Sequence, residues 1–358
     1  MKKILITLLA VCTLVGCQEN KNVKSKIGIS IPLSGSYAYW GYEFKMGADI
    51  FCEENKTVNV LYEDNQGKPN VAVSITNKLI DFNDVDVIVT MFAPFSFPLR
   101  EIVEVNKVPL ISTFNSSTTF SENYNYCYTD FATHDDQLPP LISYVVDSLK
   151  LNRGVYYCVN DDYGKDGAEI VKNIVNNYGT KIVGEFFESN VNNHRNVITK
   201  LLSSNPEYIF LIARDANLIS AVNQIRERDK DILIIGAGSF DAPTVWEGIP
   251  IENQNNIIFA SSYFDKNYNT ESLAFYEKFY QKYNRDPNYP AIYGYTICQY
   301  LSKILLDNRD KSLLKDDLEN LSYNSIRGRI AMQENRMIKS PIAIYHRCDG
   351  KTVILFTI

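Results

Sequence analysis

Residues 27–35 read Ile27-Gly28-Ile29-Ser30-Ile31-Pro32-Leu33-Ser34-Gly35. The first five form a short run rich in isoleucine, which is typical of a buried strand. The proline, serine and glycine that follow indicate a turn. Trp40, Phe44, Ala48 and Phe51 then recur at the spacing of one helix face. A strand that leads through a short loop into an amphipathic helix predicts the first β-α unit of a parallel sheet.

The β-α order continues along the rest of the chain. In the first part, strands are predicted over 58–62, 85–90 and 108–113, and helices over 71–79 and 99–105. In the second part, helices are predicted over 138–149, 167–177, 197–202 and 218–226, and strands over 154–159, 181–186, 208–212 and 232–235. A third part adds a strand over 257–261, helices over 272–283 and 293–306, and closing strands over 342–345 and 353–356. The fold class is therefore α/β, with two units of similar size built on parallel sheets.

The joints between these units contain no long glycine- or serine-rich linker. We therefore expect two lobes that are joined by short ordered crossovers. Such joints permit hinge motion of one lobe against the other rather than independent tumbling.

The N-terminus has the form of an export signal. Lys2 and Lys3 precede an apolar run over 4–15, which is too short to cross a bilayer but has the length of a signal-peptide core. The run ends in Leu14-Val15-Gly16-Cys17, which resembles a lipobox, where the peptide is cut before a cysteine that is then acylated. We expect a signal peptide over 1–16, lipidation at Cys17 and a polar tether over 17–26. The alternative is an ordinary secretory signal with an incidental cysteine.

Composition and charge argue against several kinds of partner. The 358 residues are 45% apolar and 22% charged, and the formal net charge is -6. An acidic chain without a basic stripe is not expected to bind nucleic acid. His134, His194 and His346 lie far apart and no C-x-x-C pair occurs, so no metal site is expected.

Five cysteines follow the N-terminal signal: Cys52, Cys127, Cys158, Cys298 and Cys348. Because the number is odd, at least one of them stays unpaired in a monomer, and their spacing assigns no pairing. We expect most of them to be small buried apolar side chains.

The motifs of enzymes and of cofactor sites are missing from the sequence. Gly236-Ala237-Gly238 lacks the third glycine of G-x-G-x-x-G, because position 241 is Asp, and neither a phosphate-binding loop nor a G-x-S-x-G elbow occurs. His134 stands beside Asp135 and Asp136, but no nucleophile accompanies them. The sequence therefore predicts a binding protein without a cofactor.

Candidate ligand residues follow the predicted strands, because open α/β sheets bind ligands beyond the carboxyl ends of their strands. The loops of the first unit hold Pro32 to Gly41 with three aromatic residues, Met91-Phe92-Ala93-Pro94-Phe95-Ser96, and Phe114-Asn115-Ser116-Ser117-Thr118-Thr119. The loops of the second unit hold Asn160-Asp161-Asp162-Tyr163-Gly164, Ala213-Arg214-Asp215 and Ala237-Gly238-Ser239-Phe240-Asp241. Such loops would suit the two sides of a cleft for a small molecule.

Each of these residues also has a purely structural interpretation. The hydroxyl residues from Ser116 to Thr119 are typical helix N-caps. Trp40 and Tyr163 could be packed aromatic side chains, and Arg214 with Asp215 could be a solvated ion pair.

Several of these motifs together resemble a known family. The opening from Ile27 to Gly35, Trp40-Gly41, Gly47-Ala48, residues 85–117, Tyr163-Gly164 and residues 328–350 are similar to the leucine/isoleucine/valine-binding proteins. These are type I periplasmic substrate-binding components of branched-chain amino-acid transporters. The resemblance implies two Rossmann-like lobes, joined by three crossovers, that close on a ligand by hinge motion. It implies one lobe over 27–133 and 264–332 and a second over 134–263 and 333–358.

The same resemblance implies roles for individual residues. Trp40 matches an aromatic residue that lines the family pocket. Ser116 matches a hydroxyl residue that binds the amino-acid head group, and Phe114 and Asn115 lie in the same turn. Tyr163 matches the aromatic residue of the second lobe that closes over the ligand.

Other positions depart from the family pattern. Ala93 stands where a serine is expected, with Ser96 close by, and Arg214 with Asp215 replaces an aromatic residue. Gly238 stands where an acidic residue pairs with the ligand ammonium, and Asp241 is the nearest substitute. Arg214 is suited to a ligand carboxylate. An excess of aromatic residues favours a bulkier or flatter ligand; they are Tyr37, Tyr39, Phe92, Phe95 and Phe114.

These observations predict a lipid-anchored solute-binding protein of the cell envelope. Its expected ligand is an amino acid or a related carboxylate, and its expected partners are the permease and ATPase subunits of an ABC importer, with the membrane reached through the lipid anchor. The alternative is a ligand-sensing envelope lipoprotein that signals to a partner protein.

Overall fold

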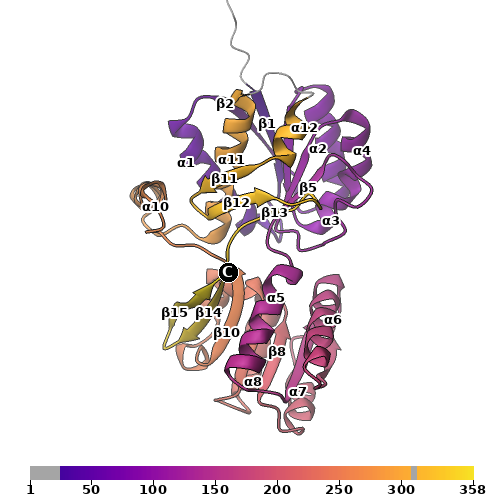
Figure 1. The fold of residues 1–358 in the computed structure, drawn as a ribbon, viewed down its shortest axis with the longest axis vertical. Helices are drawn as coiled ribbons and strands as arrows, with labels where there is room; N and C mark the ends of the chain where they lie inside the picture. The colour runs from indigo at the N-terminus through magenta and orange to yellow at the C-terminus, as the bar shows by residue number, and fades with distance from the viewer. Residues whose placement is uncertain (1–24, 308–312) are drawn as a thin grey trace, which may run out of the picture.

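The computed structural model describes residues 25–307 and 313–358. The predicted signal peptide over 1–16, Cys17 and most of the predicted tether lie outside these residues. The predicted tether extends two residues too far. Ser25 and Lys26 are the first residues of strand β1 (Ser25–Ile31), because they pair with strand β2 (Val58–Asp64) like the rest of β1. The molecule consists of two lobes stacked along its long axis (Figure 1).

A five-stranded parallel sheet in the order β2-β1-β3-β4-β5 forms the centre of the first lobe. β3 spans Val87–Met91, β4 spans Leu110–Thr113 and β5 spans Cys127–Asp130. On one face lie α1 (Ala38–Glu54) and α11 (Tyr289–Asp307), and on the other lie α2 (Pro69–Asp81), α3 (Ala93–Ser96) and α4 (Arg100–Asn106). Because both faces are covered, β1, β3, β4 and β5 are almost wholly buried.

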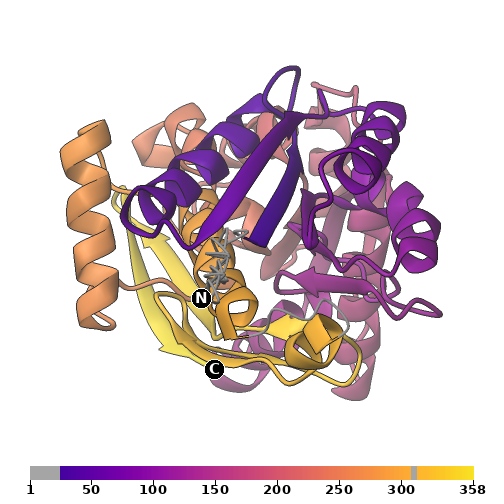
Figure 2. The ribbon, with the colours of Figure 1, turned by 90° about the horizontal axis from the view of Figure 1, so that it is seen from above.

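Helix α10 (Thr270–Tyr283) lies at the outer edge of this lobe, beside α1. Figure 2 shows it in orange, apart from the sheet. Lys278 and Lys282 of α10 form ion pairs with Glu54 and Glu53 of α1.

The second lobe is built on a seven-stranded sheet in the order β15-β14-β10-β9-β8-β6-β7. Its strands are β6 (Gly154–Val159), β7 (Val183–Phe187), β8 (Tyr208–Ile212), β9 (Leu233–Gly236), β10 (Ile257–Ser262), β14 (Ile342–Cys348) and β15 (Lys351–Thr357). α5 (His134–Ser143) and α6 (Asp162–Asn177) cover one face; α7 (Arg195–Leu202), α8 (Asp215–Arg226) and α9 (Pro243–Gly248) cover the other. The first five strands pair in parallel, and β14 and β15 pair antiparallel.

The predicted fold class is confirmed, and the two predicted closing strands are present as the antiparallel pair β14 and β15. β14 and β15 are joined at Asp349 and Gly350, which both have positive φ, as a two-residue hairpin turn requires. The helix predicted over 138–149 begins earlier, at His134. The reason is a capping box: the backbone N–H of Thr133 and its hydroxyl both donate to the Asp136 carboxylate.

The structure also contains elements that the sequence patterns did not predict. They include β5, the short helices α3 and α9, and α12 (Leu314–Glu319). They also include a three-stranded antiparallel sheet of β11 (Ser322–Ser325), β12 (Gly328–Met332) and β13 (Ile338–Lys339). Their strands are short and carry polar residues, so they lack the apolar runs of the central strands.

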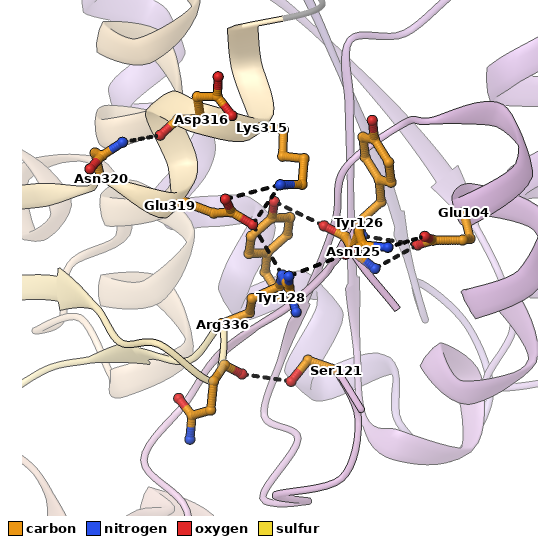
Figure 3. A network of polar contacts seen from close by, with 11 residues as sticks. Glu104, Ser121, Asn125, Tyr126, Tyr128, Lys315, Asp316, Glu319, Asn320 and Arg336 are labelled. Carbon is orange, nitrogen blue, oxygen red and sulfur yellow. Dashed lines mark hydrogen bonds and ion pairs between the residues drawn. The ribbon is translucent and has the colours of Figure 1, made fainter. Parts of the chain in front are cut away.

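The small sheet is attached to the first lobe next to β5 (Figure 3). Arg336 reaches Glu319 at 3.1 Å and Asn125 at 3.3 Å. The hydroxyl of Ser121 donates to the carbonyl of Asn335 at 2.6 Å, and Thr129 forms a backbone bridge with Met337. Glu104 of α4 accepts from the backbone N–H of Asn125 at 2.7 Å. These contacts hold the loop before β5 between α4 and the small sheet.

The chain passes between the two sheets three times. It passes from β5 to α5 over residues 131–133, from β10 to α10 over 263–269, and from β13 to β14 over 340–341. We propose lobe boundaries that follow the sheets, with residues 25–130 and 270–339 in the first lobe. The third crossover then falls after β13 rather than at residue 333, because β13 pairs with β12.

Candidate ligand-binding site

A cavity of about 210 Å³ lies between the two lobes. The first lobe lines it with Tyr37, Trp40, Phe92, Ala93, Pro94, Phe95, Phe114, Asn115, Ser116 and Tyr289, and the first crossover adds Phe131. The second lobe lines it with Gln137, Asp161, Tyr163, Arg214, Asp215, Gly238, Ser239 and Ala242. Most of these residues follow β1, β3, β4, β6, β8 and β9, so the site lies beyond the carboxyl ends of both parallel sheets.

The wall of the first lobe is aromatic. The ring of Trp40 lies 5.6 Å from Phe92, 5.6 Å from Phe114 and 5.3 Å from Tyr289, measured between ring centroids. Phe114 in turn lies 5.5 Å from Phe131. All four pairs are tilted or edge-to-face, which are arrangements that the ring quadrupoles favour. The wall is therefore a continuous packed aromatic surface.

Three lining residues hold a left-handed backbone that side chains other than glycine rarely adopt. Their φ angles are 65° at Phe92, 52° at Phe114 and 44° at Asp215. Hydrogen bonds fix the strained backbone of Phe92: its N–H donates to the carbonyl of Thr113, and its own carbonyl accepts from the hydroxyl of Ser96. Backbone strain of this kind concentrates at binding sites, where it positions side chains.

On the second lobe, several polar side chains surround the ring of Tyr163. The guanidinium of Arg214 lies 3.8 Å above the ring, and its Nη1 donates to Asp161 at 2.7 Å. The hydroxyls of Tyr163 and Ser239 are 2.7 Å apart, and His134 packs on the ring at 4.7 Å. Burial raises the pKa of Tyr163, so its phenol stays neutral near pH 7. The arrangement gives a fixed aromatic face beside one cation.

Gln137 joins the start of the second lobe to the loop after β9. Its Oε1 accepts from the N–H of Gly238 at 2.9 Å, and its Nε2 donates to the carbonyl of Ala132 at 2.6 Å. Gln137 therefore fixes the loop that carries Ser239 against the first crossover.

Eight of the predicted ligand residues are brought together at this cavity. They are Trp40, Phe92, Ala93, Phe114, Asn115, Ser116, Tyr163 and Arg214. Tyr39, Ser96 and Asp241 are absent from its lining and make other contacts. The Tyr39 hydroxyl accepts from Asn288 at 2.8 Å, the Ser96 hydroxyl bonds to Ser112 at 2.6 Å, and Asp241 accepts from Ser261 at 3.0 Å.

The strand-end loops that the sequence predicted supply further lining residues, which had been given no individual role in binding: Tyr37, Pro94, Phe95, Asp161, Asp215, Gly238 and Ser239. Tyr289 and Gln137 lie inside helices and Phe131 in a crossover. No local signal marks them, because they reach the cavity only through packing.

The described parts of the chain contain no cluster of three or more histidine, cysteine, aspartate or glutamate residues with the spacing of a metal site. None of their helices is both long and apolar enough to span a bilayer.

Relatives and solved structures agree with this geometry. The chain is 25% identical over 190 residues to Leu/Ile/Val-binding protein homolog 2 of Brucella abortus, and the match covers 51% of each chain. The chain thus spans about half the length of this relative. It is 22% identical over 234 residues to an amino acid binding protein of Pseudomonas aeruginosa, across 62% of this chain and 63% of that protein.

Among solved structures, the branched-chain amino acid transporter substrate binding protein LivJ of Streptococcus pneumoniae, in complex with isoleucine, superposes with a TM-score of 0.84. It is 20% identical, and the match covers 93% of this chain and 98% of that one. A solute binding protein of an ABC transporter from R. palustris, in complex with benzoate, gives a TM-score of 0.81 at 16% identity, across 93% and 96% of the two chains. These likenesses confirm the two-lobed type I fold.

The predicted resemblance to the leucine/isoleucine/valine-binding proteins is confirmed, and with it the prediction of a binding protein rather than an enzyme. A profile of the family described as periplasmic binding protein matches residues 24–349, which is most of the chain. Together with the two lobes and the cavity between them, this match shows that the chain belongs to the periplasmic binding protein family.

Proposed function

We propose that the protein captures a small molecule between its lobes and delivers it to the permease and ATPase subunits of an ABC importer. The observation that carries this proposal is the cavity lined by both lobes. A ligand there contacts both walls only when the lobes are together, so binding favours the closed form. The similarity to proteins named as ABC transporter substrate-binding proteins supports the delivery step.

The ligand that we propose carries a carboxylate. Arg214 has five N–H donors, of which the described structure pairs one, with Asp161. Across the cavity, the hydroxyl of Ser116 makes no hydrogen bond within the described part of the chain. A carboxylate can accept from a guanidinium and a hydroxyl at once.

We further propose that the rest of the ligand is aromatic or bulky and apolar. The wall around Trp40 and Phe114 offers ring faces and edges rather than a narrow aliphatic slot. An ammonium group would find no carboxylate at Gly238, and the two carboxylates that line the cavity, Asp161 and Asp215, both lie beside the Arg214 guanidinium. Similar structures hold benzoate and 4-hydroxybenzoate, which supports a ring with a carboxylate.

Thermal unfolding of the full chain tests this proposal. The compounds are aliphatic amino acids, aromatic amino acids, benzoate and hydroxybenzoates. A ligand at about 100 times its Kd stabilises by roughly 2.7 kcal/mol, which raises the midpoint by a few degrees. We expect the unfolding midpoint to rise with compounds that carry both an aromatic ring and a carboxylate. A rise with aliphatic amino acids alone would contradict the aromatic ligand. No rise with any compound would contradict capture of this class and favour a sensing role.

We also propose that the protein is held outside the cytoplasm by a lipid on Cys17, which follows the lipobox-like Leu14-Val15-Gly16. In cells that express the full chain, the variant Cys17→Ser should leave the membrane fraction, whereas Cys348→Ser should remain in it. Equal membrane association of both variants would contradict the anchor and leave the ordinary secretory signal.

A further inference from the structure

Helices α1 and α11 pack side by side (Figure 1). Three contacts define their register. Trp40 packs on Tyr289 with ring centroids 5.3 Å apart, Phe51 packs on Tyr295 at 5.5 Å, and the hydroxyls of Thr57 and Ser302 are 2.7 Å apart. Residues 52 and 298 fall between the last two of these contacts and therefore lie at the same level of the helix pair.

The two helix backbones approach very closely. A side chain added at Gly47 would overlap the carbonyl oxygen of Ala291, and one added at Gly294 would overlap that of Phe44. Only glycine permits this approach. A disulfide requires the Cα atoms of its cysteines to lie within roughly 4.4–6.8 Å, and helices packed backbone to backbone can meet that limit.

The residues at this level are Cys52 of α1 and Cys298 of α11, and they share one packed core, with Cys298 buried in it and Cys52 packed against it. The neighbouring Cys298 thiol lowers the pKa of Cys52, while the Cys52 thiol and burial raise the pKa of Cys298. Cys52 is partly exposed and Cys298 is buried. Cys52 is therefore the thiol that an external reagent can reach and the one that ionises first.

We infer that Cys52 and Cys298 form a reversible disulfide that cross-links α1 to α11. The oxidant is a disulfide, either a small-molecule one or the catalytic pair of a thiol oxidase. The Cys52 thiolate attacks one of its sulfurs, forms a mixed disulfide and releases one thiolate. Cys298 then gives its proton to a leaving thiolate and attacks Sγ of Cys52. The products are the Cys52–Cys298 bond and two reduced thiols of the oxidant.

This bond would act on the binding site as well as on stability. α1 begins near Trp40 and α11 begins at Tyr289, and both residues line the cavity. The bond would close a loop of about 250 residues, the range in which a cross-link restricts the unfolded chain most. The inference does not depend on which ligand the cavity holds, so it can fail or succeed separately from the proposed function.

The test treats the purified full chain with oxidised glutathione, blocks the remaining thiols with iodoacetamide in denaturant, and maps the peptides by mass spectrometry. We expect one linked pair of peptides, with Cys52 and Cys298, that dithiothreitol separates. The unfolding midpoint of the oxidised form should exceed that of the reduced form by roughly 5 °C or more. Alkylation of both thiols to the same extent before and after oxidation would overturn the inference.

Two variants resolve the order of the steps. In Cys298→Ser, Cys52 should accumulate as a mixed disulfide with glutathione, because the second thiol is missing. In Cys158→Ser, which removes a buried thiol elsewhere, the cross-link should form as in the unchanged protein. A link between any other two cysteines, or a glutathione adduct on Cys52 of the unchanged protein that never resolves, would also overturn the inference.

Discussion

Arg214 lines the cavity with most of its donors unused within the described residues. One of its nitrogens pairs with Asp161, and its plane lies on the ring of Tyr163. If it binds a ligand carboxylate, Arg214→Gln should weaken binding about 10- to 100-fold, the usual range for a hydrogen bond to a charged group. Isothermal titration with a ligand from the thermal screen measures this loss.

The control for this variant is Arg195→Gln. Arg195 forms a similar ion pair with Glu227, but on the surface of the second lobe away from the cavity. The variant Arg195→Gln should leave the Kd for the same ligand unchanged. Equal affinities for both variants would show that Arg214 has only a structural role.

Asp241 predicts a dependence of stability on pH. Burial raises the pKa of its carboxyl group from the ordinary value to about 7. The hydrogen bond from Ser261 lowers this pKa but does not outweigh burial. In the folded protein the Asp241 carboxyl group therefore stays protonated up to about pH 7, whereas in the unfolded chain it loses its proton near pH 4. The stability that the proton contributes is complete below about pH 4 and is lost as the pH rises toward 7.

Urea unfolding at a series of pH values can measure this loss. Asp241→Asn cannot ionise, so its free energy of unfolding should rise relative to the unchanged protein between pH 4 and 8. Asp81→Asn, at the exposed end of α2, is the control. Parallel curves for Asp241→Asn and the unchanged protein would contradict the prediction.

At the scale of elements, the contact of α1 with α11 shows how context reverses a propensity. In an exposed helix, Gly→Ala stabilises by about 1 kcal/mol. At Gly47 the added methyl group would overlap the backbone of α11. Gly47→Ala should therefore destabilise the protein by about 1–3 kcal/mol, the range for overpacked cores.

Chemical denaturation measures the effect, with Tyr42→Ala on the exposed side of α1 as the control. The control should change stability by less than about 0.5 kcal/mol. If Gly47→Ala is as stable as the control, this result would contradict the close approach of α1 and α11 at Gly47.

At the scale of the whole molecule, a buried polar cluster lies where the lobes are joined. Asp130, at the end of β5, pairs with Arg327 at 2.8 Å, and both side chains are 0% exposed. Arg327 packs on the ring of Tyr293, whose hydroxyl reaches Ser262 at the end of β10. The cluster thus connects the first and second crossovers with the small sheet that precedes the third.

Removing one partner of this pair should destabilise the protein strongly. Arg327→Met leaves the Asp130 carboxylate buried without a charge partner, which costs about 3–5 kcal/mol. The double variant Asp130→Asn with Arg327→Met should recover part of this loss, because no unpaired charge remains. Urea denaturation of the three proteins provides the comparison. A double variant less stable than Arg327→Met would show that the pair contributes more than mutual neutralisation.

The amount that could be predicted from sequence differs between these scales. Central strands such as 208–212 are apolar throughout, so their pattern alone indicates a buried strand. The loops after them could be located for the same reason. The sheet of β11 to β13 could not be predicted, since short half-exposed strands carry little pattern.

The sequence by itself determined the fold class, the alternation of the central strands with most of the helices, and the strand-end loops, because local periodicity and turn residues encode them. Tertiary structure alone decided which residues share the cavity and which cysteines share one packed core. Tyr289 meets Trp40, and Cys298 meets Cys52, across almost 250 residues of chain in each case. No spacing rule acts over that distance, because such contacts depend on how two lobes and three crossovers pack in space.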